Sequence, residues 1–230
     1  MKIDKKKLFA DYIPMAAAAV FIIAFAVWRG QSFIKTLPTL VTLAVQLLLV
    51  RAKPSAFLLG GVNSVLYAVS YFSEALNFSA FFALAISMPM QIYSYFNWKK
   101  NAKGGQPRIK VLSLGARLAC AAGIVTAWFV FYKCFGALVS SGCYVRLDSL
   151  IFVLGVSVTL LSSLRYVDAQ YIHLISAVLS LVLWGIICYD KPENINYVII
   201  GIYNLFRSVQ TAVSWTKISK LGGEYEKIAD

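Results

Sequence analysis

The chain has 230 residues, of which 60% are hydrophobic and 14% are charged, and its mean hydropathy is +0.71. This composition excludes an ordinary soluble domain and predicts a polytopic membrane protein. A formal charge of +12 would suggest nucleic acid as a partner of a soluble protein. Here the Lys and Arg residues cluster between apolar runs, where they encode topology. We therefore expect no nucleic-acid partner.

Eight apolar stretches are candidates for membrane spans, since a spanning helix needs about 20 residues. They are residues 12–28, 34–50, 55–72, 77–97, 111–135, 148–165, 169–189 and 194–215. The connections between them are brief and leave no room for a soluble domain. The expected fold class is therefore an all-α, polytopic membrane helical bundle.

Basic residues predict the orientation of these spans. With the N-terminus in the cytoplasm, the outer segments hold only Arg29, Lys35, Lys133, Arg146 and Lys191, and the other basic clusters are cytoplasmic. This asymmetry predicts an even number of spans and two cytoplasmic termini. The basic start at 1–7 and the apolar run after it also suit a cleaved signal peptide, which would leave the orientation of the remaining spans unchanged.

An internal repeat is indicated when the chain is shifted by 117 residues. Trp98 then lies on Trp215 and Asn63 on Ser180, without a gap over 77–100. The shift predicts a first three-helix repeat at 34–100 and a second at 141–217, joined by a basic loop and linker helix at 101–140. An extra first helix occupies 1–33, and a cytoplasmic tail occupies 218–230. A single linker span makes the two repeats parallel, in a 3+1+3 plan known for transporters.

Polar side chains lie on matched faces of four predicted helices, at the helical spacing of three or four residues. They are Asn63 and Tyr67 in 55–72, Gln91 and Tyr95 in 77–97, Gln170, His173, Ser180 and Trp184 in 169–189, and Asn204 and Arg207 in 194–215. Polar groups are costly in hydrocarbon, so these residues predict a substrate path between the two repeats. The alternative is that they only hydrogen-bond the helices together.

Three of these positions carry a more specific expectation. Pro89 lies two residues before Gln91. Because proline has no backbone N–H, it predicts a break in the fourth helix. Arg207 lies about 12 Å from the cytoplasmic boundary, too deep for easy snorkelling. It either pairs with a carbonyl or phenol or contacts substrate. His173 is either a neutral hydrogen-bonding residue or a ligand contact.

Enzymatic and ATP-driven mechanisms find no support in the sequence. It has no Gly-rich phosphate loop and no His/Glu/Asp cluster for metal binding or nucleophilic catalysis, so we expect no enzyme, no catalytic residue, no metal and no cofactor. We expect no carboxylate inside the membrane either, because the acidic residues near the spans fall at or beyond helix ends. These are Glu74, Asp148, Asp168, Asp190 and Glu193. Passive or gradient-driven uptake is the simpler interpretation.

The fourth helix carries a family resemblance. Its Pro89-Met90-Gln91 and its end at 97–101, Asn-Trp-Lys-Lys-Asn, resemble the corresponding helix of the PnuC family of vitamin-precursor transporters. The resemblance covers the second to eighth helices. It implies a facilitator of nicotinamide riboside, or of a related nucleoside-like vitamin, in the bacterial inner membrane, with a homotrimeric assembly and cytoplasmic phosphorylation that traps the product.

Two departures from the family pattern bear on the ligand. The residues at 170–173, Gln-Tyr-Ile-His, replace the W-x-x-W pair typical of nicotinamide riboside transporters, and Arg207 would repel a cationic substrate in a dry site. Both departures favour a neutral nucleoside-like vitamin or an anionic one as the substrate. We expect Tyr67, Tyr95 and Trp184 to stack on the ring of a small substrate. The expected hydrogen-bonding residues are Asn63, Gln91, Gln170, His173 and Asn204. The alternatives are a SWEET-like sugar facilitator and a membrane scaffold without transport activity.

Overall fold

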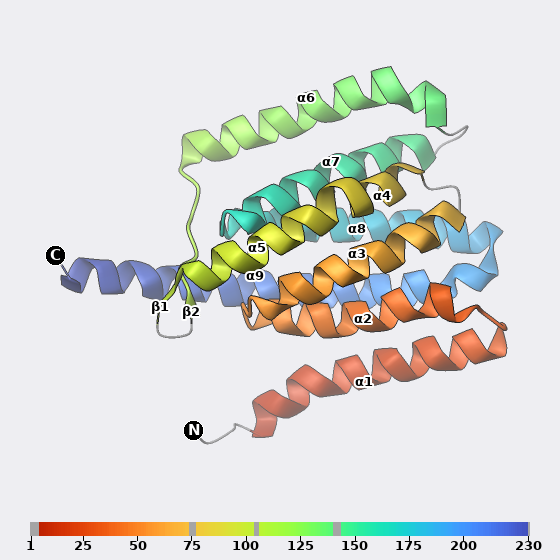
Figure 1. The fold of residues 1–230 in the computed structure, drawn as a ribbon, viewed down its shortest axis with the longest axis horizontal. Coiled ribbons are helices and arrows are strands. Elements are labelled where there is room, and N and C mark those ends of the chain that lie inside the picture. Colours follow the sequence, from red (N-terminus) through yellow and green to blue (C-terminus); the bar gives the residue numbers. More distant parts are fainter. Residues whose placement is uncertain (1–4, 74–76, 104–105, 140–143, 230) are drawn as a thin grey trace.

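A computed structural model describes residues 5–73, 77–103, 106–139 and 144–229. Long helices run side by side along one direction (Figure 1). They are α1 (Lys5–Trp28), α2 (Phe33–Val50), α3 (Ser55–Ser73), α4 (Asn77–Phe81), the π-helix η1 (Phe82–Ser87), α5 (Met88–Lys100), α6 (Leu114–Val139), α7 (Tyr144–Ser163), α8 (Asp168–Asp190), the 3-10 turn η2 (Pro192–Asn194) and α9 (Ile195–Ala229). A small antiparallel hairpin, β1 (Ala102–Lys103) and β2 (Gln106–Pro107), interrupts the basic loop.

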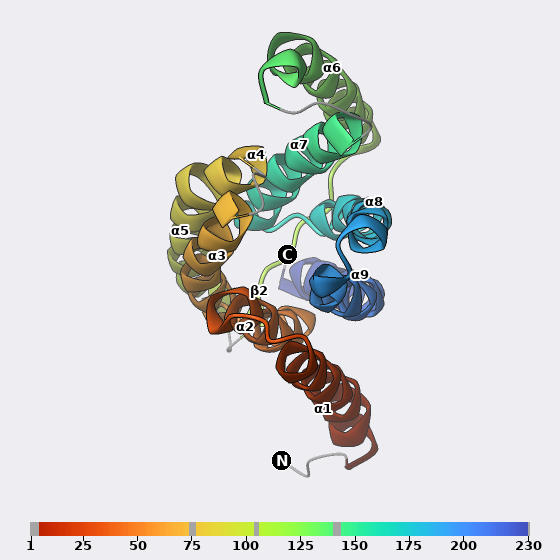
Figure 2. The ribbon, with the colours of Figure 1, turned by 90° about the vertical axis from the view of Figure 1, so that its right-hand side faces the viewer.

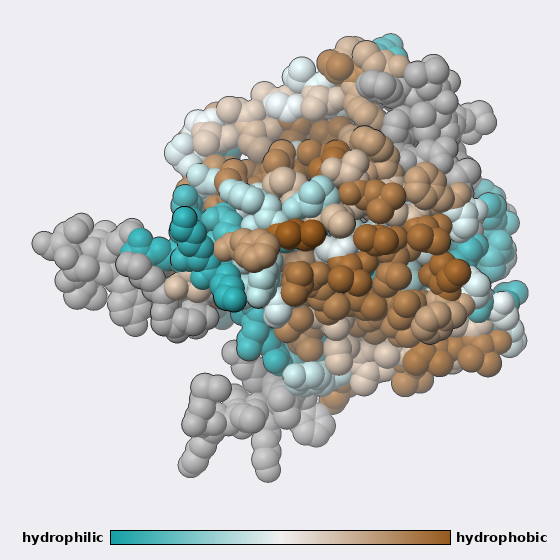
Figure 3. Space-filling view, viewed as in Figure 1, coloured by the Kyte–Doolittle hydropathy of each residue, from teal (hydrophilic) through white to brown (hydrophobic). Residues whose placement is uncertain are grey.

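The expected all-α membrane bundle is confirmed. Within the described ranges, six helices are long and apolar enough to cross a membrane: α1, α2, α3, α6, α7 and α8. Two predicted spans fall outside this group, because η1 divides the fourth helix into short pieces and polar residues lower the hydropathy of α9. Apolar residues form a broad band across the middle of the surface in Figure 3, with hydrophilic residues at both ends.

Several predicted boundaries differ from the structure. Helix α1 begins at Lys5 rather than residue 12, and α9 continues to Ala229, so the predicted tail extends the last helix. Glu74, expected beyond a helix end, lies outside the described residues. The shift in α1 matters most, because it places Asp11 inside a helix.

The break expected at Pro89 takes the form of a π-helical turn on its N-terminal side. The backbone N–H of Met88 donates to the carbonyl of Ala83, five residues earlier. Proline has no N–H, and its ring clashes with a carbonyl in the preceding turn of a regular helix. The wider π turn accommodates this ring, and such turns are frequent at functional sites.

The helices pack in two groups of three. Helix α3 packs on α2 and α5, and α8 packs on α7 and α9. The groups meet along two seams, α2 against α9 and α5 against α7. Viewed from the end, α3 and α5 lie on one side, α8 and α9 on the other (Figure 2), while α1 packs outside α2 and α9, and α6 outside α7.

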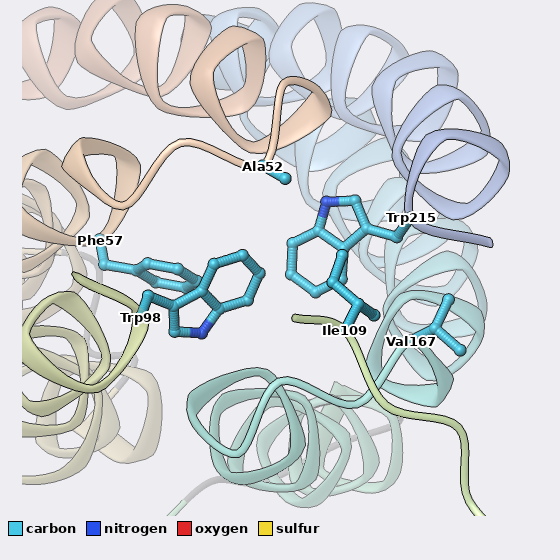
Figure 4. Close-up of a cluster of buried hydrophobic side chains, with 6 residues drawn as sticks. All are labelled: Ala52, Phe57, Trp98, Ile109, Val167 and Trp215. Atoms are coloured by element: carbon cyan, nitrogen blue, oxygen red, sulfur yellow. The ribbon is translucent and has the colours of Figure 1, made fainter. Parts of the chain in front are cut away.

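Two tryptophans join the groups at one end of the bundle. The rings of Trp98 and Trp215 lie 4.8 Å apart, and both side chains are completely buried (Figure 4). Trp98 Nε1 donates to the carbonyl of Ser162 at the end of α7, at 2.8 Å, and Trp215 Nε1 donates to the carbonyl of Leu49 at the end of α2, at 2.9 Å. Each tryptophan therefore closes one seam by binding the helix end of the opposite group.

The residues that follow these two helix ends share an uncommon backbone conformation. Ala52, after α2, has φ 50°, and Arg165, after α7, has φ 68°. Non-glycine residues rarely adopt positive φ values, because the Cβ then crowds the carbonyl. The two groups thus end their first helices with the same turn geometry. At Arg165, burial lowers the pKa of the guanidinium, and the adjacent Arg108 lowers it further.

Candidate functional site

A cavity of about 340 Å³ lies between the two helix groups. Its wall comes from α2, α3, α4, η1 and α5 on one side and from α7 and α8 on the other. The lining residues are Val45, Gln46, Leu49, Phe57, Ser64, Tyr67, Tyr71, Ser79, Phe82, Ala83, Ser87, Gln91, Ser94, Ile151, Phe152, Gly155, Val158, Thr159, Ser162, Gln170, His173, Ser176 and Ser180. The cavity is within the usual size range for a small-molecule site.

Half of the residues predicted from the sequence line this cavity. They are Tyr67, Gln91, Gln170, His173 and Ser180. The other predicted residues, Asn63, Tyr95, Trp184, Asn204 and Arg207, are not part of the wall. The structure therefore brings together the faces of α3, α5 and α8 and leaves the polar face of α9 behind them.

A buried hydrogen-bond network holds Tyr67 in the wall. Its hydroxyl lies 2.9 Å from Thr42 Oγ1, and Asn63 Nδ2 donates to the same oxygen at 2.9 Å. The Thr42 hydroxyl donates to the carbonyl of Pro38 at 2.8 Å, so its oxygen accepts from both Asn63 and Tyr67. Asn63 thus positions Tyr67 from behind the wall.

Tyr67 begins a stack of aromatic rings that crosses the two helix groups. Its ring centroid lies 5.3 Å from that of Tyr71, and the Tyr71 centroid lies 6.5 Å from that of Trp184. Trp184 stacks in turn on Tyr197 at 4.0 Å, nearly parallel. Trp184, expected to contact substrate directly, therefore supports Tyr71, which lines the cavity.

His173 lines the cavity, and a hydrogen bond to α9 fixes its ring. Its Nδ1 lies 3.1 Å from Ser208 Oγ, and the same hydroxyl donates to the carbonyl of Asn204 at 2.7 Å. Ser208 has one hydroxyl proton, and it is used in the bond to Asn204. His173 Nδ1 therefore carries a proton and donates it to Ser208 Oγ. The other nitrogen, Nε2, is then a hydrogen-bond acceptor. Asn204 takes part through its backbone rather than from the wall.

The Gln91 side chain lies against the backbone of α3. A Cβ atom at Gly60 would come within 3.0 Å of Gln91 Oε1, and one at Gly61 within 3.6 Å of Gln91 Cβ. Glycine at position 60 is therefore what allows the amide this close to α3. Nearby, Ser64 Oγ and Ser87 Oγ lie 2.9 Å apart and join α3 to the π turn.

Arg207 pairs on the opposite side of α9, away from the cavity. Its side chain is completely buried, with Nη1 3.8 Å from Asp11 Oδ1 and 2.7 Å from Gln210 Oε1. Nη2 donates to the backbone carbonyl of Asp11, and the guanidinium lies 5.1 Å from the centre of the Tyr203 ring. Arg207 therefore binds a backbone carbonyl, as expected, and also pairs with the carboxylate of the same residue.

The expectation that no carboxylate lies inside the membrane was wrong. Asp148 and Asp168, expected at or beyond helix ends, are buried inside the spanning segments of α7 and α8, and Asp168 pairs with Arg117. Asp11, in α1, is a third case. Its side chain also accepts from Arg51 Nη2 at 2.9 Å, a hydrogen bond that raises the pKa of the Arg51 guanidinium. Asp11 therefore bridges α2 and α9 from α1. Residue 11 precedes the apolar run at 12–28, so the hydropathy pattern places it outside the spans.

Tyr95, the remaining predicted residue, belongs to the core. It packs against the cluster around Trp98, and its ring faces Phe96 and Lys99. In contrast, α2 and α7 supply wall residues that the matched polar faces did not predict, among them Gln46 and Thr159. Gln46 could have been found from the sequence, because it is an isolated glutamine in an apolar helix.

The cavity wall carries polar and aromatic groups but no charge. Among the described residues, none of those that line it is Asp, Glu, Lys or Arg. Hydroxyl and amide groups lie among aromatic rings and aliphatic side chains, and most of the surface is apolar. Such a wall can stack a flat ring and hydrogen-bond neutral groups, and it has no cationic side chain to neutralise an anion.

Together, the bundle and its uncharged cavity define a multi-pass membrane protein with a candidate small-molecule site between two three-helix groups. Residues 32–217 match the family model described as nicotinamide mononucleotide transporter. The chain belongs to this family of transporters and is not an enzyme, which confirms the expected PnuC relationship. No curated protein matches the chain in sequence.

The fold also resembles a solved structure. The crystal structure of the vitamin B3 transporter PnuC superposes with a TM-score of 0.80, over 92% of this chain and 92% of that chain. The two sequences are 19% identical, so this similarity concerns the fold. Helix α1 lies outside the matched family region, although it supplies Asp11.

Proposed function

We propose that this transporter takes up nicotinamide riboside, the unphosphorylated vitamin precursor, through the cavity between the helix groups and without ATP hydrolysis. The observation that carries the proposal is the uncharged wall, in which tyrosine rings lie beside amide and hydroxyl groups. A pyridinium ring with a carboxamide and a ribose presents complementary groups. Family membership and the name of the structurally similar transporter support the same substrate class.

The charge of the ligand favours the riboside over its phosphate ester. A phosphate group in this cavity would be buried without a cationic partner in the wall, which is strongly unfavourable. The pyridinium, by contrast, gains from the negative face of the Tyr67 ring, which ends the aromatic stack. Arg207, which would oppose a cation if its charge were unpaired, is compensated by Asp11.

Individual roles follow from the positions in the wall. Tyr67 offers a ring face to the pyridinium, with Tyr71 stacked behind it, and Gln91 and Gln170 offer amides to its carboxamide. His173 Nε2 is available as an acceptor for a ribose hydroxyl. The ring, the carboxamide and the ribose of the substrate each have a partner in the wall, and each hydrogen bond contributes about 1 kcal/mol.

We further propose that the two groups of three are parallel repeats that rock against each other during transport. The equivalent contacts of Trp98 and Trp215, each with the end of the first helix of the opposite group, support this plan. In this proposal the protein lies in the bacterial inner membrane as a homotrimer with both termini in the cytoplasm, and phosphorylation there traps the product. No observation favours a sugar facilitator or a scaffold.

Ligand-dependent stability and uptake test the proposal. Nicotinamide riboside at 100 times its Kd should stabilise the purified protein by about 2.7 kcal/mol, seen as a rise in apparent Tm. Nicotinamide mononucleotide and monosaccharides should not produce this rise. Gln91→Ala should abolish most of the shift and most uptake into proteoliposomes, whereas Tyr95→Phe, outside the wall, should preserve both. A response to the mononucleotide alone would refute the substrate assignment.

A further inference from the structure

A buried carboxylate lies directly behind the cavity wall. Asp148, in the first turns of α7, has only 7% of its surface exposed, and its Oδ1 accepts a hydrogen bond of 2.9 Å from Ser79 Oγ. Ser79 is itself a wall residue. One hydroxyl group therefore separates this carboxylate from the cavity.

Asp148 differs from the buried acids Asp11 and Asp168, whose negative charges are paired with arginines. Asp11 forms ion pairs with Arg207 and Arg51, and Asp168 pairs with Arg117 at 2.7 Å. No described Lys or Arg side chain is within ion-pair distance of Asp148. A carboxylate held this way in a weakly polar region attracts any cation that enters nearby.

The aromatic stack lies at the same end of the bundle as Asp148. Tyr71 and Trp184 are near the ends of α3 and α8, Tyr197 is near the start of α9, and these helix ends lie at the same end of the bundle as the start of α7 (Figure 1). Tyr71 lines the cavity, and Asp148 has a weak electrostatic interaction with its phenol. Ring faces and a carboxylate thus converge on one end of the cavity, an arrangement that suits an organic cation.

We propose that Asp148 is the specificity residue that selects a positively charged ring, acting through space from behind Ser79. The inference rests on the proposed uptake of nicotinamide riboside and adds the group that recognises its charge. Tyr67 stacks on the pyridinium, and Asp148 stabilises its charge at longer range. A neutral ring of the same shape keeps the stacking but loses the attraction.

A pair of ligands that differ in charge tests this assignment. Nicotinamide riboside is cationic, and its dihydro form is neutral with the same carboxamide and ribose. Wild-type protein should bind the cation at least about tenfold more tightly than the neutral form, measured by ligand-dependent Tm or calorimetry. Asp148→Asn keeps a hydrogen-bond acceptor for Ser79 and should remove this preference while leaving affinity for the neutral form unchanged.

Two matched variants separate local recognition from surface charge and folding. Asp190→Asn removes an exposed acidic residue at the end of α8 and should keep the tenfold preference. Asp148→Glu retains the charge and should restore most of the preference. If Asp148→Asn does not fold, the preference of the wild type and of Asp148→Glu still tests the inference, since equal binding of both ligands would overturn it.

The outcomes also distinguish this inference from the proposed function. Wild-type protein that does not bind nicotinamide riboside would refute the proposed function, and the inference would fall with it. Wild-type protein that binds it, together with Asp148→Asn protein that keeps the same preference for the cation, would overturn only the role of Asp148.

Discussion

Substitution of Asp11 by Asn should destabilise the protein strongly while leaving the cavity wall intact. The substitution removes the carboxylate that faces a completely buried guanidinium at 3.8 Å. With an effective dielectric constant of about 20, Coulomb's law gives about 4 kcal/mol for that separation. Arg207 keeps the backbone carbonyl of residue 11 and Gln210 as partners. We therefore expect a loss of about 3 kcal/mol, in the range found when one partner of a buried pair is removed.

Two controls share the same network. Arg51 is the more exposed partner of Asp11, with 33% of its side chain exposed. Arg51→Gln should lower the free energy of unfolding by less than about 1 kcal/mol, because solvent screens that pair. Arg207→Met removes the buried charge itself and leaves Asp11 paired with Arg51. It should therefore be less destabilising than Asp11→Asn.

The measurement is reversible unfolding of the detergent-solubilised protein, followed by nicotinamide riboside binding to the folded variants. Equal stabilities for Asp11→Asn and Arg51→Gln would refute the reasoning, since they would mean that the buried charge needs no counter-ion. Folded Arg207→Met should bind the ligand with unchanged affinity, because Arg207 is outside the wall. A tenfold change in its affinity would instead identify Arg207 as a substrate contact.

Three further predictions concern the wall and the seams. Gly60→Ala places a Cβ 3.0 Å from Gln91 Oε1, so this flexible side chain must move; affinity should fall about tenfold in a binding assay with little change in Tm. His173→Leu removes the Nε2 acceptor and should cost about 1 kcal/mol of binding energy, by calorimetry. Trp98→Phe and Trp215→Phe each lose one hydrogen bond to a helix end and should lower unfolding stability by similar amounts, about 1 kcal/mol; a difference of several kcal/mol would contradict their equivalence.

Helical periodicity in the sequence identifies some of the residues that line the cavity. The faces that carry Tyr67, Gln91 and Gln170 line the cavity because a helix fixes which side chains share a side. Spacing alone, however, does not show whether a polar residue faces a cavity, a neighbouring helix or another polar group. Asn63 and Trp184 lie behind wall residues, a distinction that depends on how α2 and α9 approach.

Apolar runs of sufficient length are enough to specify the membrane bundle, and the helix ends and overall pattern of the sequence are enough to specify the family. The partner of Arg207 depends instead on the packing of the helices, because Asp11 is separated from it by most of the chain. The contribution of α2 and α7 to the wall depends on the same packing. The physical reason is that lipid-facing and packed surfaces of membrane helices are both apolar, so the pattern of one helix does not specify its rotation toward distant neighbours.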